Sequence, residues 1–184
     1  MSKTNLSKFN NDWYKPGSNP IKRLCWYFTN AAWINSAFPV SGFKIFLLRM
    51  YGAKIGAGVV IKPHVNIKYP WKLEIGNNVW IGEYVWIDNL AQVTIQDNVC
   101  ISQGALLLCG NHNYKKESFD LIVGEIKLEK GVWIGAKATV CPGVTCHDHA
   151  VLAVGSVATS NLDAYKIYQG NPAKFIRERK FENA

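Results

Sequence analysis

The sequence of 184 residues lacks the features of secreted and disulfide-bonded proteins. Its five cysteines, at positions 25, 100, 109, 141 and 146, form no CxxC pair and no regular framework. The N-terminus, MSKTNLSKFNNDWYKPG, is polar and has no apolar segment of the kind that a secretory signal needs. An odd number of cysteines without a signal predicts reduced, mostly buried thiols in a cytoplasmic protein.

A long, uninterrupted apolar run is also missing. The most apolar stretch, residues 24–48, contains Asn, Pro, Gly and Lys residues and is too interrupted to span a bilayer as one helix. Asn19 and Pro20 predict the start of a first helix that ends at Pro39. Ser41 is the expected cap of a second helix that Gly52 terminates. We expect these helices to pack on the protein, with contact to a membrane surface as the alternative.

Acidic residues are scarce relative to basic ones. The chain has 21 Lys and Arg against 13 Asp and Glu, which gives a formal net charge of +8. This excess suits anionic partners such as phosphates, nucleic acid or anionic lipid. Because no basic run or aromatic platform accompanies it, we expect no nucleic-acid partner.

What the sequence does contain is a repeat with a period of six. The spacing is six throughout, except for steps of eight after Ile67 and Ile87 and a long step after Leu107. A helix would show spacings of three and four, and a single strand a spacing of two. The period predicts an all-β solenoid, a parallel β-helix of about five coils spaced roughly 4.8 Å apart. The residues in phase are Ile55, Ile61, Ile67, Ile75, Ile81, Ile87, Ile95, Ile101, Leu107, Leu128, Ile134, Val140, Cys146, Leu152 and Ala158.

This repeat divides the chain into three parts. Residues 1–53 form the predicted N-terminal helical cap, 54–160 the β-helix, and 161–184 a tail with a strand and a helix. The ends of a solenoid need covers, because they expose a strand edge and an apolar interior. Asn171 and Pro172 predict the start of the short, basic C-terminal helix.

The repeat breaks once, between Leu107 and Leu128, where the step is 21 residues. We therefore expect a loop extruded at about residues 108–125, which contains His112. A loop on a rigid solenoid is a natural place for a functional group, although a tolerated surface insertion explains the break equally well.

With its hexads, the GNHNY of this loop and the ending GVWIGAKATVCPGVTCHDHAVLAVGSVATSNLDAYKIYQGNPAKFIRER, the sequence resembles the hexapeptide-repeat acyltransferases over residues 54–180. With NNDWYKPG and the run VVIKPHVNIKYPWKLEIGNNVWIGEYVWIDNLAQVTI, it is similar to the colanic-acid biosynthesis acetyltransferase subgroup. The resemblance implies a left-handed β-helix, acetyl-CoA as acyl donor and homotrimers with active sites between subunits. It further implies O-acetylation of a sugar hydroxyl in exopolysaccharide biosynthesis, on a sugar or a lipid- or nucleotide-linked saccharide.

The same resemblance identifies His112 as the general base of a direct transfer. A sugar hydroxyl is a poor nucleophile near neutral pH, and an imidazole within hydrogen-bond reach can take its proton. Asp88 and Asn89, at a corner one coil earlier, are candidates to orient His112, although Asp-Asn is also ordinary turn chemistry. Glu83 and Asn111 are further candidates.

For the coenzyme, the resemblance points to small and basic residues of the later coils. Lys174 and Arg177 are expected on one face of the C-terminal helix, where they suit a phosphate. The positions that match coenzyme contacts are Trp133, Gly135, Ala136, Ala153, Val154, Thr159, Lys174 and Arg177.

Other functions stay open at this stage. Carbonic anhydrases with the same fold bind zinc through three histidines, but His64, His112, His147 and His149 are poorly placed to converge, and we expect no metal. A trimeric scaffold without activity, and N-acetylation of an amino sugar or small amine, are the alternatives to O-acetylation.

Overall fold

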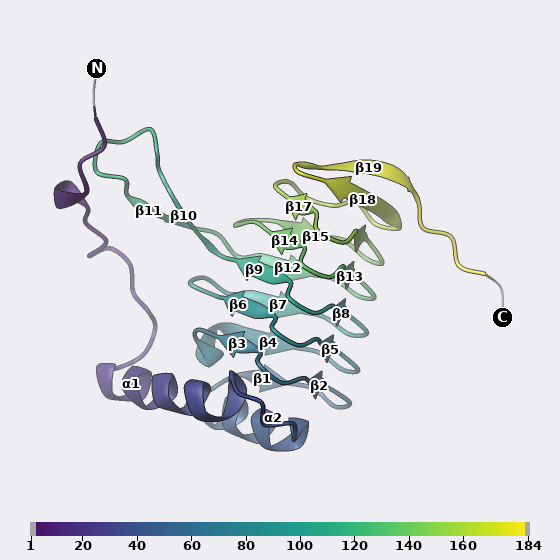
Figure 1. Cartoon of the computed structure of the whole chain (residues 1–184), viewed down its shortest axis with the longest axis horizontal. Coiled ribbons are helices and arrows are strands. Elements are labelled where there is room, and N and C mark those ends of the chain that lie inside the picture. The colour runs from purple at the N-terminus through teal and green to yellow at the C-terminus, as the bar shows by residue number, and fades with distance from the viewer. Residues whose placement is uncertain (1–2, 183–184) are drawn as a thin grey trace.

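The computed structural model describes residues 3–182 as a three-sided coil with helices at one end (Figure 1). Each turn of the coil adds one strand to each of three parallel sheets, which we call A, B and C. Sheet A contains β1 (Lys54–Ile55), β4 (Leu73–Ile75), β7 (Val93–Ile95), β12 (Ile126–Leu128) and β15 (Thr145–Cys146). Sheet B contains β2 (Val60–Ile61), β5 (Trp80–Ile81), β8 (Cys100–Ile101), β13 (Trp133–Ile134), β16 (Val151–Leu152), β18 (Lys166–Gly170) and β19 (Ala173–Glu178). Sheet C contains β3 (Asn66–Ile67), β6 (Trp86–Asp88), β9 (Leu106–Leu108), β14 (Thr139–Val140) and β17 (Val157–Ala158).

The coils number five, followed by a partial sixth formed by a bridge between Cys146 and Leu162 and by β18. This confirms the predicted all-β solenoid. Each strand is short because the chain must turn a corner every six to eight residues. Consecutive coils pair in register, so that Ile81 lies on Ile101 and Ile101 on Ile134.

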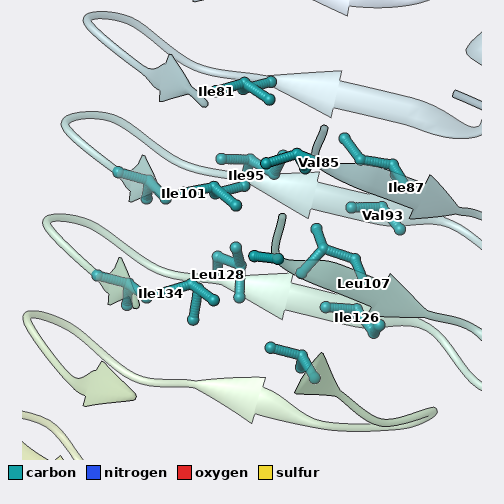
Figure 2. Close-up of a cluster of buried hydrophobic side chains, with 14 of the residues drawn as sticks. Ile81, Val85, Ile87, Val93, Ile95, Ile101, Leu107, Ile126, Leu128 and Ile134 are labelled. Atoms are coloured by element: carbon teal, nitrogen blue, oxygen red, sulfur yellow. The ribbon is translucent and has the colours of Figure 1, made fainter. Parts of the chain in front are cut away.

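The interior of the coil is filled by the residues that are in phase with the repeat (Figure 2). Fourteen of the fifteen predicted inward positions are buried, and Ile55 in the first coil is half-buried. Burying an aliphatic side chain of this size contributes about 1.5–3 kcal/mol. The stacked columns therefore provide most of the driving force for folding.

The N-terminal helices cover the open end of the first coil (Figure 1). They are α1 (Pro20–Thr29), the π-helical turn η2 (Asn30–Ile34) and α2 (Ser41–Met50), with short 3-10 turns at η1 (Leu6–Lys8) and η3 (Pro70–Lys72). Trp26 is buried against the coil and donates its indole N–H to the carbonyl of Ile67 at 3.0 Å. None of the helices in the described part of the chain is long and apolar enough to cross a bilayer.

The predicted caps of these helices are confirmed in part. The side chain of Asn19 accepts a hydrogen bond from the N–H of Lys22, as expected of an N-cap. Ser41, in contrast, does not cap α2; it is the first helical residue, and its hydroxyl accepts from the N–H of Ile61 at 2.8 Å. The prediction for Ser41 is wrong because a strand of the first coil competes for its hydroxyl.

The predicted C-terminal helix is also wrong. Residues 173–178 form β19, which pairs antiparallel with β18 and closes the last edge of sheet B. Asn171 and Pro172 lie in the turn of this hairpin, since an Asn-Pro pair begins turns as readily as helices. A helix here would leave the backbone groups of β18 without partners, whereas a strand satisfies them.

Candidate active site

The break in the repeat is a β-hairpin that projects from the corner between sheets C and A (Figure 1). Its strands are β10 (Gly110–His112) and β11 (Leu121–Val123), which pair antiparallel so that His112 lies opposite Leu121. A turn of residues 113–120 joins the two strands. His112 is the last residue of β10, and the hairpin backbone fixes the position of its side chain.

The imidazole of His112 is held in one orientation. Its Nδ1 lies 2.9 Å from the backbone carbonyl oxygen of Phe119, and its ring stacks on that of Phe119 with centroids 4.5 Å apart. The ring of Phe9 approaches from the N-terminal segment, with centroids 5.8 Å apart. Because a carbonyl can only accept, Nδ1 carries the proton in the neutral ring, and Nε2 is left with a free lone pair.

His112 lines a cavity of about 680 Å³ between the hairpin, the corner after β6 and the N-terminal segment. Phe9, Tyr14 and Arg23 contribute to its wall from the N-terminal segment and α1. Asp88 contributes from the corner. The cavity therefore combines segments that are far apart in the sequence.

Asp88 lies in this cavity but does not orient His112. Its carboxylate is 7% exposed and accepts a hydrogen bond from the Nζ of Lys68 at 2.8 Å. The partner of His112 is instead the carbonyl of Phe119. Asp88 and Lys68 thus present an ion pair to the cavity, opposite the histidine-bearing hairpin.

Asn89 has a structural part. Its side chain is fully buried, accepts from the N–H of Tyr69, and donates to the carbonyls of Tyr69 and Lys72 at 2.6 and 3.0 Å. With all its polar atoms bound to the backbone, Asn89 cannot orient His112, and it stabilises the corner. Of the further candidates, Asn111 lines the His112 cavity, whereas Glu83 lines a different cavity on sheet B.

The sequence-based reasoning missed the contribution of the N-terminal segment to this cavity. Tyr14 donates its hydroxyl to the carbonyl of Leu90 at 2.8 Å, and Lys72 donates to the same carbonyl at 2.6 Å. Burial raises the pKa of Tyr14, with the charges of Tyr69 and Asp88 adding to the effect, so the phenol stays protonated. The stretch NNDWYKPG supported the family resemblance, but nothing local in it indicates a site residue.

A second cavity, of about 510 Å³, lies along the outer face of sheet B. Six of the eight positions predicted to contact the coenzyme line it; Thr159 and Lys174 do not. The six are Trp133, Gly135, Ala136, Ala153, Val154 and Arg177.

The wall of this cavity is narrow and offers backbone donors. A Cβ on Gly135 would lie 2.6 Å from the backbone nitrogen of Val154, so only glycine allows the two coils to approach here. Within residues 3–182, the N–H groups of Ala136 and Val154 have no acceptor. Trp133 is fixed by donation of its indole N–H to the hydroxyl of Ser102 at 2.9 Å.

Lys174 and Arg177 lie on a strand rather than a helix. Lys174 pairs with Gln169 and Arg177 with Ile167, and the register shifts between them. Paired residues of an antiparallel ladder share a face, and so do residues two apart. The irregularity therefore puts both basic residues on the same face, as predicted, although for a different reason.

The fold matches solved structures of acetyltransferases. A hexapeptide-repeat acetyltransferase of Vibrio cholerae, solved with acetyl-CoA, is 22% identical; the match covers 91% of this chain and 93% of that one, with a TM-score of 0.80. A galactoside acetyltransferase solved with coenzyme A is 26% identical over 88% of this chain and 82% of that chain, with a TM-score of 0.77. These matches confirm the predicted left-handed β-helix.

No protein-family model matches the sequence. WcaF of Escherichia coli (strain K12), a protein assigned as a colanic acid biosynthesis acetyltransferase, is 38% identical over 166 residues, which cover 89% of this chain and 90% of WcaF. This chain belongs to the hexapeptide-repeat acetyltransferases. The family resemblance predicted from the sequence is thereby confirmed.

In this acetyltransferase the two cavities lie on different sides of the coil (Figure 1). The His112 cavity lies at the corner between sheets C and A, and the second cavity lies on sheet B. The two cavities have no lining residue in common. A reaction that uses both therefore needs two chains placed side by side.

The histidines of the acetyltransferase do not form a metal site within the described residues. His64 stacks on Tyr84 with centroids 4.7 Å apart, and His147 accepts or donates a hydrogen bond to Glu129 at 3.1 Å. Across residues 3–182, no three His, Cys, Asp or Glu side chains come together in a way that could hold a metal ion.

Proposed function

We propose that this protein transfers the acetyl group of acetyl-CoA directly to a sugar hydroxyl in exopolysaccharide biosynthesis. The observation that carries the proposal is the fixed tautomer of His112, whose Nδ1 donates to the Phe119 carbonyl. The names of the relatives support the class of acceptor: WcaF is assigned to colanic acid biosynthesis, and a galactoside O-acetyltransferase of Escherichia coli is 29% identical over 140 residues.

His112 is the proposed general base. Its Nε2 faces the role of accepting the proton of the acceptor hydroxyl, while the proton on Nδ1 stays on the Phe119 carbonyl. As Nε2 takes up this proton, the ring becomes an imidazolium, and the hydrogen bond from Nδ1 to a carbonyl strengthens. The stacked rings of Phe119 and Phe9 keep the imidazole from rotating out of this position.

The cavity on sheet B is the proposed site for acetyl-CoA, the donor that supplies the activated acetyl group. Gly135 and Ala153 leave room for an extended chain, and the N–H groups of Ala136 and Val154 suit its amide carbonyls. Arg177 lines the same cavity and suits a phosphate. The residues present thus fit the donor.

The proposed assembly is a homotrimer with its active sites between subunits. The argument is the separation of the two cavities on one chain, because a hairpin that projects from one chain can reach the sheet B cavity of a neighbour. A cyclic arrangement repeats the same contact around the ring and completes every site. The site of action proposed for this trimer is the cytoplasm.

The first test is calorimetric titration of acetyl-CoA into the purified protein and three variants. We expect binding in the micromolar range that His112→Ala leaves unchanged and that Arg177→Ala weakens about tenfold or more, since one charged hydrogen bond is lost. Lys174→Ala is the matched control, because Lys174 lies outside the cavity. Absence of binding in a folded protein would leave the trimeric scaffold as the better account.

An acceptor screen follows, with sugars and amino sugars of matched structure. Acetylation of a hydroxyl that His112→Ala abolishes supports the proposal. Acetylation of the amino group alone would replace the O-acetyltransferase by an N-acetyltransferase at the same site.

A further inference from the structure

The exposed face of α1 is its apolar face. Ile21, Leu24 and Phe28 are 75%, 59% and 62% exposed, and their spacing of three and four places them on one side of the helix. The opposite side contacts the first coil through Trp26. A helix that covers a globular core normally turns its apolar side inward, so α1 has the reverse arrangement.

The same reversal occurs in α2. Phe43, Phe46 and Met50 are 36%, 56% and 63% exposed, while Lys44 is fully buried. The Nζ of Lys44 donates to the carbonyls of Ile34 and Lys62 at 3.2 and 2.8 Å, and burial lowers its pKa. The charged residue thus closes the end of the coil, and the aromatic residues face outward.

An aromatic cluster joins the outer faces of the two helices. The ring of Trp33 lies 5.3 Å from those of both Phe38 and Phe43, centroid to centroid, and Phe43 lies 6.4 Å from Phe46. Trp33 is 41% exposed. Exposed aromatic residues of this kind concentrate at the interface between a bilayer and water.

The net positive charge of the protein comes from the same region. Residues 1–62 contain nine Lys and Arg and one acidic residue, Asp12, and the difference equals the net charge of +8 of the whole chain. Residues 63–184 contain twelve basic and twelve acidic residues. An apolar face within a basic region is the combination that binds anionic membrane surfaces.

We propose that this outer face, which we call the cap face, binds the surface of a bilayer that contains anionic lipid. Two copies of the cap face would repel one another through their like charges, whereas anionic lipid neutralises them. The side chains of the cap face are Ile21, Leu24, Phe28, Trp33, Phe43, Phe46 and Met50.

The cap face also gives a route to the site, an extension that rests on the proposed function. A cavity of about 560 Å³ is lined by Leu24 and Tyr27 of α1, and it has Arg23, Lys68 and Asp88 in common with the His112 cavity. The acceptor cleft therefore reaches from His112 to the membrane-binding helix. A saccharide carried on a membrane lipid is the acceptor class that this arrangement suits, with its phosphate near Arg23 and Lys68.

The test is co-sedimentation of the full-length protein with vesicles of phosphatidylcholine alone, or with an equimolar amount of phosphatidylglycerol. We expect binding to the anionic vesicles that weakens as salt is raised, because the charges are screened. Phe28→Ser/Phe46→Ser should reduce this binding about tenfold or more. Phe181→Ser is the matched control, since Phe181 is 57% exposed and lies in the C-terminal segment; it should bind like the wild type.

Two outcomes would overturn the proposal. One is wild-type protein that does not bind the anionic vesicles, or a double variant that binds them as well as Phe181→Ser does. The other is a smaller assembly of the double variant in sedimentation equilibrium, which would make the cap face a contact between copies. Acetyl-CoA titration of the same variants separates this from the proposed function, because both variants should bind the donor normally.

Discussion

The interior of the coil and the hairpin of β10 and β11 are held together in different ways. In the interior, residues such as Ile101 are fully enclosed by neighbours from the coils above and below (Figure 2). In the hairpin, every residue from 110 to 123 is half-buried or exposed. It is fixed by its own ladder and by contacts with the N-terminal segment, such as the N–H of Asn5 donating to the carbonyl of Glu117 at 2.8 Å.

This difference separates stability from chemistry. Substitutions inside the coil change the free energy of unfolding, because they remove buried apolar contacts. Substitutions in the hairpin act on the reaction and leave the coil intact, since few of their side chains contribute to its packing. Both halves of this statement can be measured.

The largest expected effect is that of His112→Ala on the reaction. We expect the rate of acetyl transfer to the acceptor found in the screen to fall about 10²–10⁴-fold, because the general base is lost. The free energy of unfolding should change by less than about 1 kcal/mol. His147→Ala is the control, since His147 lies on the outer side of the coil next to Glu129. Equal losses of activity in the two variants would contradict the assignment of His112.

Next in size is the effect of a cavity in the interior. Ile101→Ala should lower the free energy of unfolding by about 2–5 kcal/mol, measured by denaturant titration. Ile122→Ala makes the same chemical change in the hairpin, where the side chain is 45% exposed, and should cost less than about 1 kcal/mol. Similar costs at the two positions would show that the hairpin is part of the cooperative core.

The two glycines at the base of the hairpin sharpen the comparison further. A Cβ on Gly124 would lie 2.4 Å from the backbone nitrogen of Gly143, whereas a Cβ on Gly110 would meet only the end of the Leu90 side chain, at 2.5 Å. A side chain can rotate away, but the backbone of the next coil cannot. Gly124→Ala should therefore destabilise the protein by about 1–3 kcal/mol, and Gly110→Ala by clearly less. Thermal unfolding of both variants measures this difference, and the reverse order would contradict the backbone contact as the cause.

The smallest expected effect concerns charge on the outside of the coil. The Nζ of Lys127 donates to Glu129 at 2.8 Å and, with a hydrogen bond to His147, lowers the pKa of Glu129 below its ordinary value of 4.5. Its folded pKa is lower than its unfolded pKa, so the stabilisation exists above 4.5 and is lost as the pH falls through the folded pKa. Near neutral pH, Glu129→Gln should cost less than about 1 kcal/mol.

Unfolding curves at several pH values test this last prediction. The wild type and Glu129→Gln should converge in stability once the pH falls below the folded pKa of Glu129. Lys127→Met should remove most of the difference between the two proteins at neutral pH. A gap that persists in acid would mean that Glu129 stabilises the coil by packing and not by its charge.

The sequence predicts the coil well because its period follows from one physical requirement. A side chain that points inward must return to the same face after each strand and corner, so the positions of Ile61 and Leu152 are set by the same count. Ile55 is the partial exception, because the first coil has no neighbour below it except the helices. The position of His112 follows as well, since the break in the count locates the hairpin.

The rest of the site depends on contacts between distant segments, and these leave no local pattern. The carbonyl that fixes His112 belongs to Phe119, and a backbone atom cannot be recognised from residue type. Tyr14 joins the cavity by a hydrogen bond to Leu90, 76 residues away. Asn89 reads as a polar site residue in the sequence, but the backbone of the preceding coil occupies all its polar atoms.

The way the chain returns from the hairpin has a consequence for how such proteins diversify. After Val123, β12 pairs with β7 so that Ile126 lies on Val93 and Leu128 on Ile95, just as β7 pairs with β4 below. The coil therefore continues as if no residues had been inserted. The length and sequence of the insertion can change from one descendant to another without moving a single core residue. New acceptors can thus be acquired by exchanging one segment on an inherited, unaltered framework.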